Sequence, residues 1–281
     1  MTEPAISYPP QSIVTFGKRV LIGMPWQKTT NPLTSFCVQR LVDTRRCATT
    51  MNHGDAFVAH TRNAIGDVFL NSDLEWLLTI DDDMILPVGS AEVFKAHTGF
   101  NFGEPFMSMN ALDRLMSHGK TLVGALYFGR QGTNSPPVYK EGMENRQEAL
   151  YARSGPHDLI KPTGWVGTGC MLIHRSVFEG IEKRFPNLAR APGLGGQYFT
   201  STEANLRPDV EKIRDYLAGN LTAEGAYKAF NALNTASARA KADNPRSCGE
   251  DVSFCLRAMA AGHQPYVDMG LRCGHVGTYV Y

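Results

Sequence analysis

The chain has 281 residues, which is long enough for one large domain or two small ones. Its hydrophobic fraction of 43% and charged fraction of 20% are ordinary for a soluble globular protein. A formal net charge of +1 gives no electrostatic case for a protein that coats nucleic acid.

The six cysteines lack paired spacing, which suits reduced thiols better than a disulfide framework. No apolar run approaches the ~20 residues of a membrane helix, and the N-terminus lacks a signal-peptide core. We therefore expect a cytoplasmic protein without a membrane span.

The first third of the chain predicts alternating strands and helices. Residues 1–17 form a proline-rich N-terminal arm, and we expect a single domain over residues 18–281. Hydrophobic patterns predict a buried strand at 18–25, a helix at 33–44, a β-like run at 47–51, a helix at 56–71 and a buried strand at 76–80. This order predicts an α/β fold with a mostly parallel central sheet flanked by helices.

The rest of the chain is less regular. Patterns predict helices at 111–118 and 250–260, and strands at 121–127, 138–139, 159–161, 164–174 and 265–267. Glycines interrupt the strand at 164–174, and Gly167 and Gly169 indicate a close backbone approach to a ligand there, or tight packing alone. Residues 186–245 read as a helical insertion with helices at 209–218 and 223–242. We interpret it as a lid or an acceptor-side element.

Three consecutive carboxylates, Asp81, Asp82 and Asp83, follow the buried strand at 76–80. Two unit charges about 4 Å apart repel by roughly 1 kcal/mol in water and by more near a protein surface, so the cluster needs a cation or solvent. Strand alternation would place Asp81 and Asp83 on one side and Asp82 on the other. The pattern predicts a hard divalent cation at Asp81 and Asp83, the alternative being a solvated acidic turn.

A second acidic pair, Glu250 and Asp251, follows Gly249 at the predicted start of a helix. The helix dipole favours carboxylates there, and capping alone would explain one of them. A carboxylate held at a fixed helix N-terminus is also suited to act as a general base for a hydroxyl. His275 lies between glycines in a segment without periodicity, where a neutral imidazole could complete a metal shell.

Taken together, these motifs resemble the GT-A glycosyltransferases, most closely the family 2 type of nucleotide-sugar-dependent enzymes. The resemblance covers about residues 18 to 277 and implies a Rossmann-like GT-A catalytic domain. It is carried by the strand at 20–25, Arg62-Asn63, Asp81-Asp82-Asp83 as the D-x-D motif, residues 165–171, Gly249-Glu250-Asp251 as the E-D motif, and His275.

The resemblance implies a metal-dependent transferase that moves a sugar from a nucleotide-diphosphate sugar to an acceptor hydroxyl. Asp83 and Asp81 would bind Mn²⁺ or Mg²⁺, Asp251 would be the general base of an inverting displacement, and Glu250 would lie beside the sugar. His275 resembles the third metal ligand of several retaining enzymes, so the stereochemical outcome stays open. Donor contacts would come from Pro25, Asp55, Arg62, Asp81, Asp82, Gly167 and Gly169.

Two other functions remain as alternatives. A nucleotidyltransferase would need a glycine-rich basic loop after the first strand, whereas residues 23–28 are poor in glycine. A non-catalytic sugar-binding module would not need Asp251. The acceptor is not identified, although basic residues on and beside the predicted helix at 223–242 would suit nucleic acid if they are not simply a solvated helix face.

Overall fold

The computed structural model describes residues 20–26, 31–45, 48–53, 58–99, 110–127, 159–160, 165–190, 195–200 and 249–276. Within these residues, seven strands form one sheet in the order β2-β1-β3-β7-β5-β8-β6. Their bounds are β1 Val20–Trp26, β2 Ala48–His53, β3 Trp76–Ile80, β5 Leu122–Leu126, β6 Leu159–Ile160, β7 Cys170–His174 and β8 Tyr266–Arg272. All but the antiparallel β6 and β7 run in one direction, which confirms the predicted mixed α/β architecture with a mostly parallel sheet.

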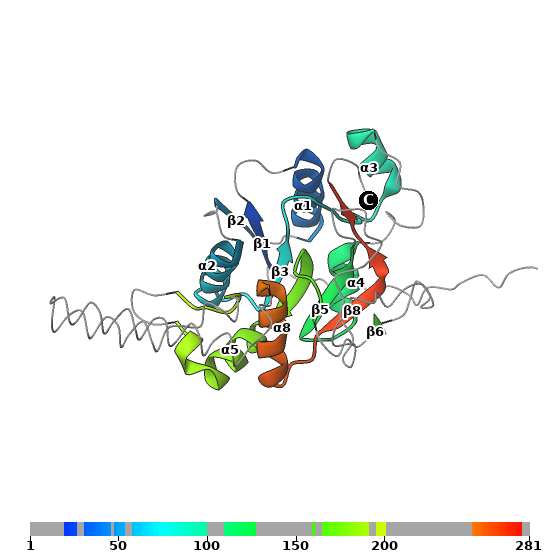
Figure 1. Ribbon diagram of the computed structural model, residues 1–281. Helices are drawn as coiled ribbons and strands as arrows, with labels where there is room; N and C mark the ends of the chain where they lie inside the picture. Colours follow the sequence, from blue (N-terminus) through cyan, green and yellow to red (C-terminus); the bar gives the residue numbers. More distant parts are fainter. Residues whose placement is uncertain are drawn as a thin grey trace, which may run out of the picture.

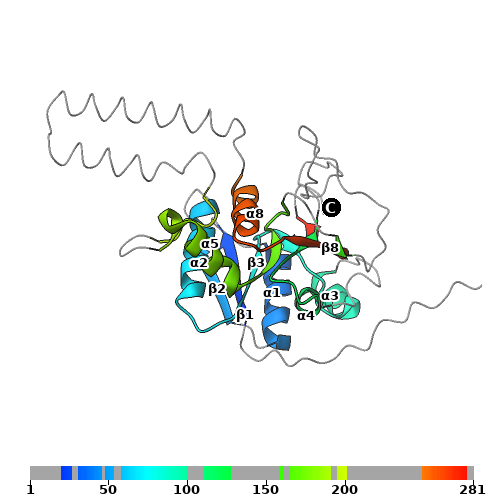
Figure 2. The same cartoon turned by 90° about the horizontal axis from the view of Figure 1, so that it is seen from below.

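Helices cover both faces of this sheet (Figures 1 and 2). One face carries α1 (Pro32–Arg45), α3 (Ala91–Thr98) and α4 (Ala111–Ser117), and the other carries α2 (Val58–Leu70), α5 (Arg175–Arg184) and α8 (Glu250–Ala260). Strand β3 is apolar except at Thr79 because it faces both layers: Leu77 packs in one core cluster and Leu78 in the other.

The order of the first three strands creates a switch point in the sheet. From β1 the chain crosses through α1 to β2, and it then returns through α2 to β3 on the other side of β1. Crossovers between parallel strands are right-handed. The β1-α1-β2 and β2-α2-β3 crossovers run in opposite directions across the sheet, so α1 and α2 lie on opposite faces. Ligands of open α/β sheets bind at the carboxyl ends of strands at such a point. Gly23 of β1 pairs with Thr79 of β3, and Pro25 and Asp81, each two residues farther along the chain, lie at this switch point.

A bulge in β8 builds a second, two-stranded sheet beside this edge. Ala125 of β5 pairs with Asp268, but the next residue, Leu126, pairs with Arg272, so residues 269–271 leave the ladder. The chain then forms β9 (Gly274–His275), which pairs antiparallel with β4 (Met84–Ile85). The bulge thereby brings the C-terminal part of the chain next to the acidic turn that follows β3.

The structure corrects three details of the prediction. Strand β3 ends at Ile80, directly before the carboxylates as predicted, but Asp81–Asp83 then form a turn, closed by the Met84 amide donating to the Asp81 carbonyl at 3.2 Å, instead of the extended run that the expected alternation requires. Helix α3 was not predicted, although Ser90 caps its start and Gly99, with a φ of 76°, ends it. Helix α5 was also missed, because it begins directly after β7 without a turn residue.

Several predictions lie outside the described residues: the arm at 1–17, the strand at 138–139 and the helices at 209–218 and 223–242. The described start of the predicted insertion contains η1 (Pro186–Leu188) and residues 195–200, and there Tyr198 and Phe199 are fully buried. The four described cysteines are free and buried, as predicted for reduced thiols. In the part of the chain that the structure describes, no helix is long and apolar enough to cross a membrane.

Candidate active site

Arg62 on α2 links the two acidic motifs. Its guanidinium donates to Asp81 Oδ1 at 2.6 Å, to Glu250 Oε1 at 2.8 Å and to Asp251 Oδ1 at 2.8 Å. The Arg62 side chain is only 3% exposed, whereas those of the three carboxylates are 23 to 26% exposed. The predicted D-x-D and E-D motifs therefore converge on one buried cation at the carboxyl end of β3.

The three neighbouring carboxylates keep Arg62 positively charged. Burial alone would lower the pKa of Arg62, but Asp81, Asp251 and Glu250 raise it well above its ordinary value. The helix that carries Arg62 is itself held at its C-terminal end, where Arg175 donates to the carbonyls of Phe69 and Leu70 at 2.9 and 3.1 Å. A fixed, permanently charged guanidinium thus offsets the repulsion among Asp81, Glu250 and Asp251, whereas the sequence predicted repulsion among Asp81, Asp82 and Asp83.

Asp251 is held at one oxygen only. Its Oδ1 accepts hydrogen bonds from Arg62 and from the hydroxyl of Thr168, and within the described residues Oδ2 has no such partner. Burial raises the pKa of Asp251 above the ordinary carboxyl value, and the charge of Glu250 adds to this while Arg62 and Thr168 oppose it. A carboxylate with one anchored oxygen and a raised pKa is well suited to accept a proton at the other oxygen.

Thr168, Thr79 and Tyr127 belong to this site; Thr168 was expected only as part of the motif at 165–171, and Thr79 and Tyr127 were not predicted from the sequence. The buried Thr79 hydroxyl donates to the Thr168 carbonyl at 2.8 Å and so fixes the residue that holds Asp251. The Tyr127 hydroxyl accepts from the Gly169 amide at 2.9 Å. Burial raises the pKa of Tyr127 well above its ordinary value, and the nearby Asp251 and Asp81 add to this, so its hydroxyl stays protonated.

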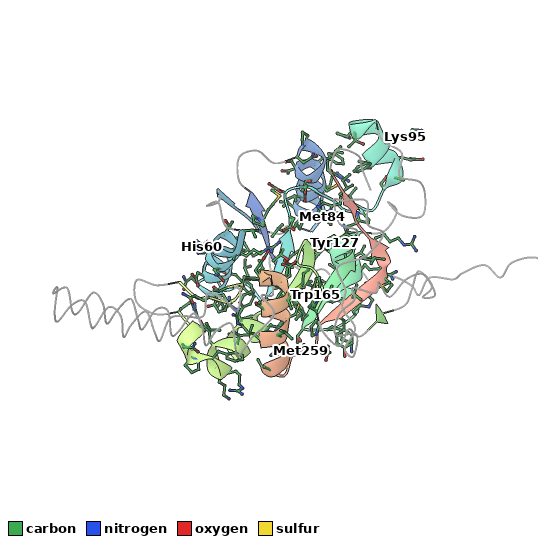
Figure 3. All side chains as sticks on the ribbon, in the orientation of Figure 1. His60, Met84, Lys95, Tyr127, Trp165 and Met259 are labelled. Atoms are coloured by element: carbon green, nitrogen blue, oxygen red, sulfur yellow. The ribbon has the colours of Figure 1, made fainter. Side chains whose placement is uncertain are left out.

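Asp83 and His275 form a second pair beside the first cluster. His275 Nε2 lies 3.1 Å from Asp83 Oδ2, and both side chains are largely buried. The pairing of β4 with β9 sets this distance, because Met84 is the cross-strand partner of His275 and the Val276 amide donates to the Asp83 carbonyl at 2.8 Å. The ring of Tyr127 packs edge-on against His275 with centroids 5.9 Å apart. Met84 and Tyr127 mark this region in Figure 3.

The aspartates that alternation was expected to pair point to different partners. Since Asp81 to Asp83 form a turn rather than an extended strand, the period-2 rule does not apply to them. Asp81 binds Arg62, whereas Asp83 binds His275. Within the described residues, Asp81, Asp83 and His275 do not form a group of three arranged to hold a metal ion. Asp83 and His275 are the predicted ligands that the structure does bring together.

The remaining predicted residues are distributed as follows. Pro25 is buried at the end of β1, and Asp82 lies in the turn, where its carbonyl accepts from the Asn31 amide at 3.1 Å. Gly167 and Gly169 are buried just before β7. Asp55 lies outside the described residues. Pro25, Asp82 and Gly169 therefore surround the same strand ends as the two acidic clusters.

Gly169 is close to side chains of the site. A Cβ at this position would lie 2.9 Å from the Tyr127 ring and 3.1 Å from Asp81 Oδ2. We expect Gly169→Ala to lower the free energy of unfolding by about 1–3 kcal/mol, because the extra methyl must displace Tyr127 or Asp81. Urea unfolding measures this loss. Gly249→Ala is the matched control, since a Cβ there would meet no atom within 4 Å, and an equal loss in both variants would contradict the crowding argument.

No protein-family model matches the chain, and no curated protein matches it either. Among solved structures, A197 from STIV aligns with a TM-score of 0.45 and 15% identity over 92% of this chain and 86% of that chain. A glycosyltransferase involved in the glycosylation of the major capsid of PBCV-1 aligns with a TM-score of 0.29 and 10% identity over 62% of this chain and 68% of that chain. One distant structural neighbour is thus a glycosyltransferase, but likenesses this remote carry no functional argument.

Proposed function

We propose that the protein is a GT-A-type glycosyltransferase that moves a sugar from a nucleotide-diphosphate sugar to an acceptor hydroxyl. The observation that supports this most directly is the convergence of both acidic motifs on Arg62, at the strand ends where open α/β sheets bind ligands. Arg62 and Glu250 are 188 residues apart in the sequence, yet they bond at 2.8 Å. A solvated acidic turn would not require this buried arrangement.

In the proposed reaction Asp251 is the general base. Its Oδ2 accepts the proton of the acceptor hydroxyl, while Arg62 and Thr168 hold Oδ1. The hydroxyl oxygen bonds to the anomeric carbon of the donor as the bond from that carbon to the diphosphate oxygen breaks, and the diphosphate leaves with the electron pair. Holding the base in place contributes to the rate because proton transfer depends on orientation as well as on pKa. A single displacement of this kind inverts the anomeric configuration.

Asp83 and His275 are the residues that would hold the divalent metal. Carboxylate oxygens suit Mn²⁺ and Mg²⁺, imidazole nitrogen is a common ligand of transition metals, and the 3.1 Å between Asp83 Oδ2 and His275 Nε2 would allow both to reach one ion. When bound, such an ion offsets the negative charge of a departing diphosphate. Asp81 is committed to Arg62, so we propose that it contributes to the site by orienting Arg62 and the donor rather than as the principal ligand.

The proposed donor and metal sites are tested by ligand-induced stabilisation. A thermal-shift panel of UDP-, GDP- and other nucleotide sugars, with and without Mn²⁺, should reveal one donor that stabilises the protein only with metal, by about 2.7 kcal/mol at 100 times its dissociation constant. Asp83→Ala should remove this stabilisation while leaving a folded protein. Asp73→Ala removes an exposed carboxylate elsewhere and is the control. Undiminished metal-dependent stabilisation in Asp83→Ala would exclude Asp83 as a ligand.

A further inference from the structure

A buried network of charged residues lies at the bulge of β8, away from the acidic clusters. The Asp268 side chain is 0% exposed, and its carboxylate accepts from Arg114 Nε at 2.5 Å and Arg114 Nη2 at 2.8 Å, with His118 Nε2 at 2.6 Å. Arg114 and His118 lie one turn apart on and just after α4. Burial raises the pKa of Asp268, but hydrogen bonds from His118 and Arg114 outweigh this and lower the pKa to about 2.

The same carboxylate also holds the backbone of the bulge. Asp268 Oδ1 accepts from the amides of Gly270 and Leu271 at 2.8 and 3.0 Å, which closes the three residues that leave the β5 ladder into a tight turn. The chain rejoins β5 directly afterwards, because the Cys273 amide donates to the Leu126 carbonyl at 2.8 Å. The Asp268 carboxylate thus binds the side chains of Arg114 and His118 and also the backbone amides of the bulge.

The bulge decides where His275 lies. Three residues of extended strand span roughly 10 Å at about 3.3 Å per residue. If β8 continued beside β5 without the bulge, His275 would lie about that far beyond its present position and could not pair with Met84 or meet Asp83. The register of β9 against β4, and with it the His275 to Asp83 distance of 3.1 Å, therefore depends on the turn that Asp268 closes.

We propose that Asp268, oriented by Arg114 and His118, is the positioning residue for His275 in the metal centre, an inference that rests on the proposed function. It does not touch the metal pair and acts only through the bulge. Groups that orient a metal ligand by direct hydrogen bonds change metal affinity by about 10- to 100-fold when they are replaced, and we expect an effect of the same order here because the bulge sets the position of the His275 backbone. Asp268→Asn keeps the size of the side chain but places an amide against Arg114 and His118, so it should disturb the bulge.

The test uses two measurements on the full chain. Mn²⁺ affinity is measured by the electron paramagnetic resonance signal of the free ion, and register is measured by hydrogen exchange of the Val276 amide in metal-free protein. For Asp268→Asn we expect Mn²⁺ binding weaker by about 10- to 100-fold and faster exchange of Val276. If this variant does not fold, His118→Leu, which removes one contact and leaves Arg114, should show the same changes to a smaller degree.

Arg175→Met is the matched control, because it removes a half-buried arginine whose guanidinium donates to carbonyls of residues 69–74, at the end of α2 and just after it, and not to β8 or β9. It should lower the melting temperature without changing Mn²⁺ affinity or Val276 exchange. Wild-type values of both quantities in folded Asp268→Asn would overturn the positioning role. Absence of Mn²⁺ binding by the wild type would instead overturn the metal part of the proposed function, and Val276 exchange would still decide whether Asp268 positions His275.

Discussion

Replacement of Asp251 by asparagine is expected to lower the rate of sugar transfer by about 10² to 10⁴, the usual contribution of a positioned general base. Asparagine keeps the size of the side chain and an oxygen that Arg62 and Thr168 can still reach, but it cannot take up the acceptor proton. Donor affinity should stay close to that of the wild type, because the proton is transferred only during the reaction. Steady-state transfer and thermal-shift titration with the donor separate these two effects.

The pH dependence of transfer provides a second check on Asp251. The base must be ionised to act, so the rate rises as pH increases through its pKa. Burial, the largest influence, raises the pKa of Asp251 above the ordinary value of 3.8. The midpoint of the acidic limb in the pH profile of kcat/KM should therefore lie at a higher pH than it would for an exposed carboxyl group. Asp73→Asn, which changes an exposed carboxylate, should leave both the transfer rate and the midpoint of the acidic limb unchanged. Near wild-type transfer by Asp251→Asn would place the base elsewhere or indicate a retaining mechanism.

Arg62→Met is expected to lower the free energy of unfolding by about 3–5 kcal/mol at neutral pH. The variant leaves Asp81, Glu250 and Asp251 side by side without the guanidinium that contacts all three. Their mutual repulsion then disfavours the charged forms and raises their pKa values in the folded state. Urea unfolding of the wild type and the variant measures the difference.

The response to pH distinguishes lost charge from lost packing. A raised carboxyl pKa means that the folded variant binds protons more tightly than its unfolded chain, so its stability should increase as pH falls from about 8 to about 5. Arg190→Met is the control, because Arg190 pairs with Glu182 at a more exposed site, with 33% of its side chain accessible, and such pairs contribute about 1 kcal/mol or less. Losses of equal size in the two variants, or no recovery at lower pH, would contradict the counter-ion role of Arg62.

The strands and most helices of the first half could be predicted from the sequence because apolar runs and helical periodicity alternate there. Two helices were missed for local reasons: α5 follows β7 without a break, and α3 is a short element that only the Ser90 cap and Gly99 reveal. The bulge at Asp268 could not be predicted, since its register depends on contacts with α4 that are more than 100 residues distant.

For the candidate site, residue types indicated the chemistry but not the partners. Asp251 and Arg62 were both identified, yet Arg62 was expected at the donor, and only the fold shows that it bonds three carboxylates. Asp81 and Asp83 diverge because the chain turns after Ile80. Thr168 and Tyr127 gave no signal of their own, because a threonine and a tyrosine within an apolar strand region are as compatible with the core as with a site.

The most direct test of the proposed transferase is an assay for Mn²⁺-dependent release of nucleoside diphosphate from a panel of nucleotide sugars. Wild type and Asp73→Asn should both consume the donor that stabilises the protein. Asp251→Asn should bind that donor and leave it intact, because Asp251 alone is proposed to activate the attacking hydroxyl or water. If no nucleotide sugar is bound or consumed, or if Asp251→Asn consumes the donor as fast as the wild type, the proposed function is wrong.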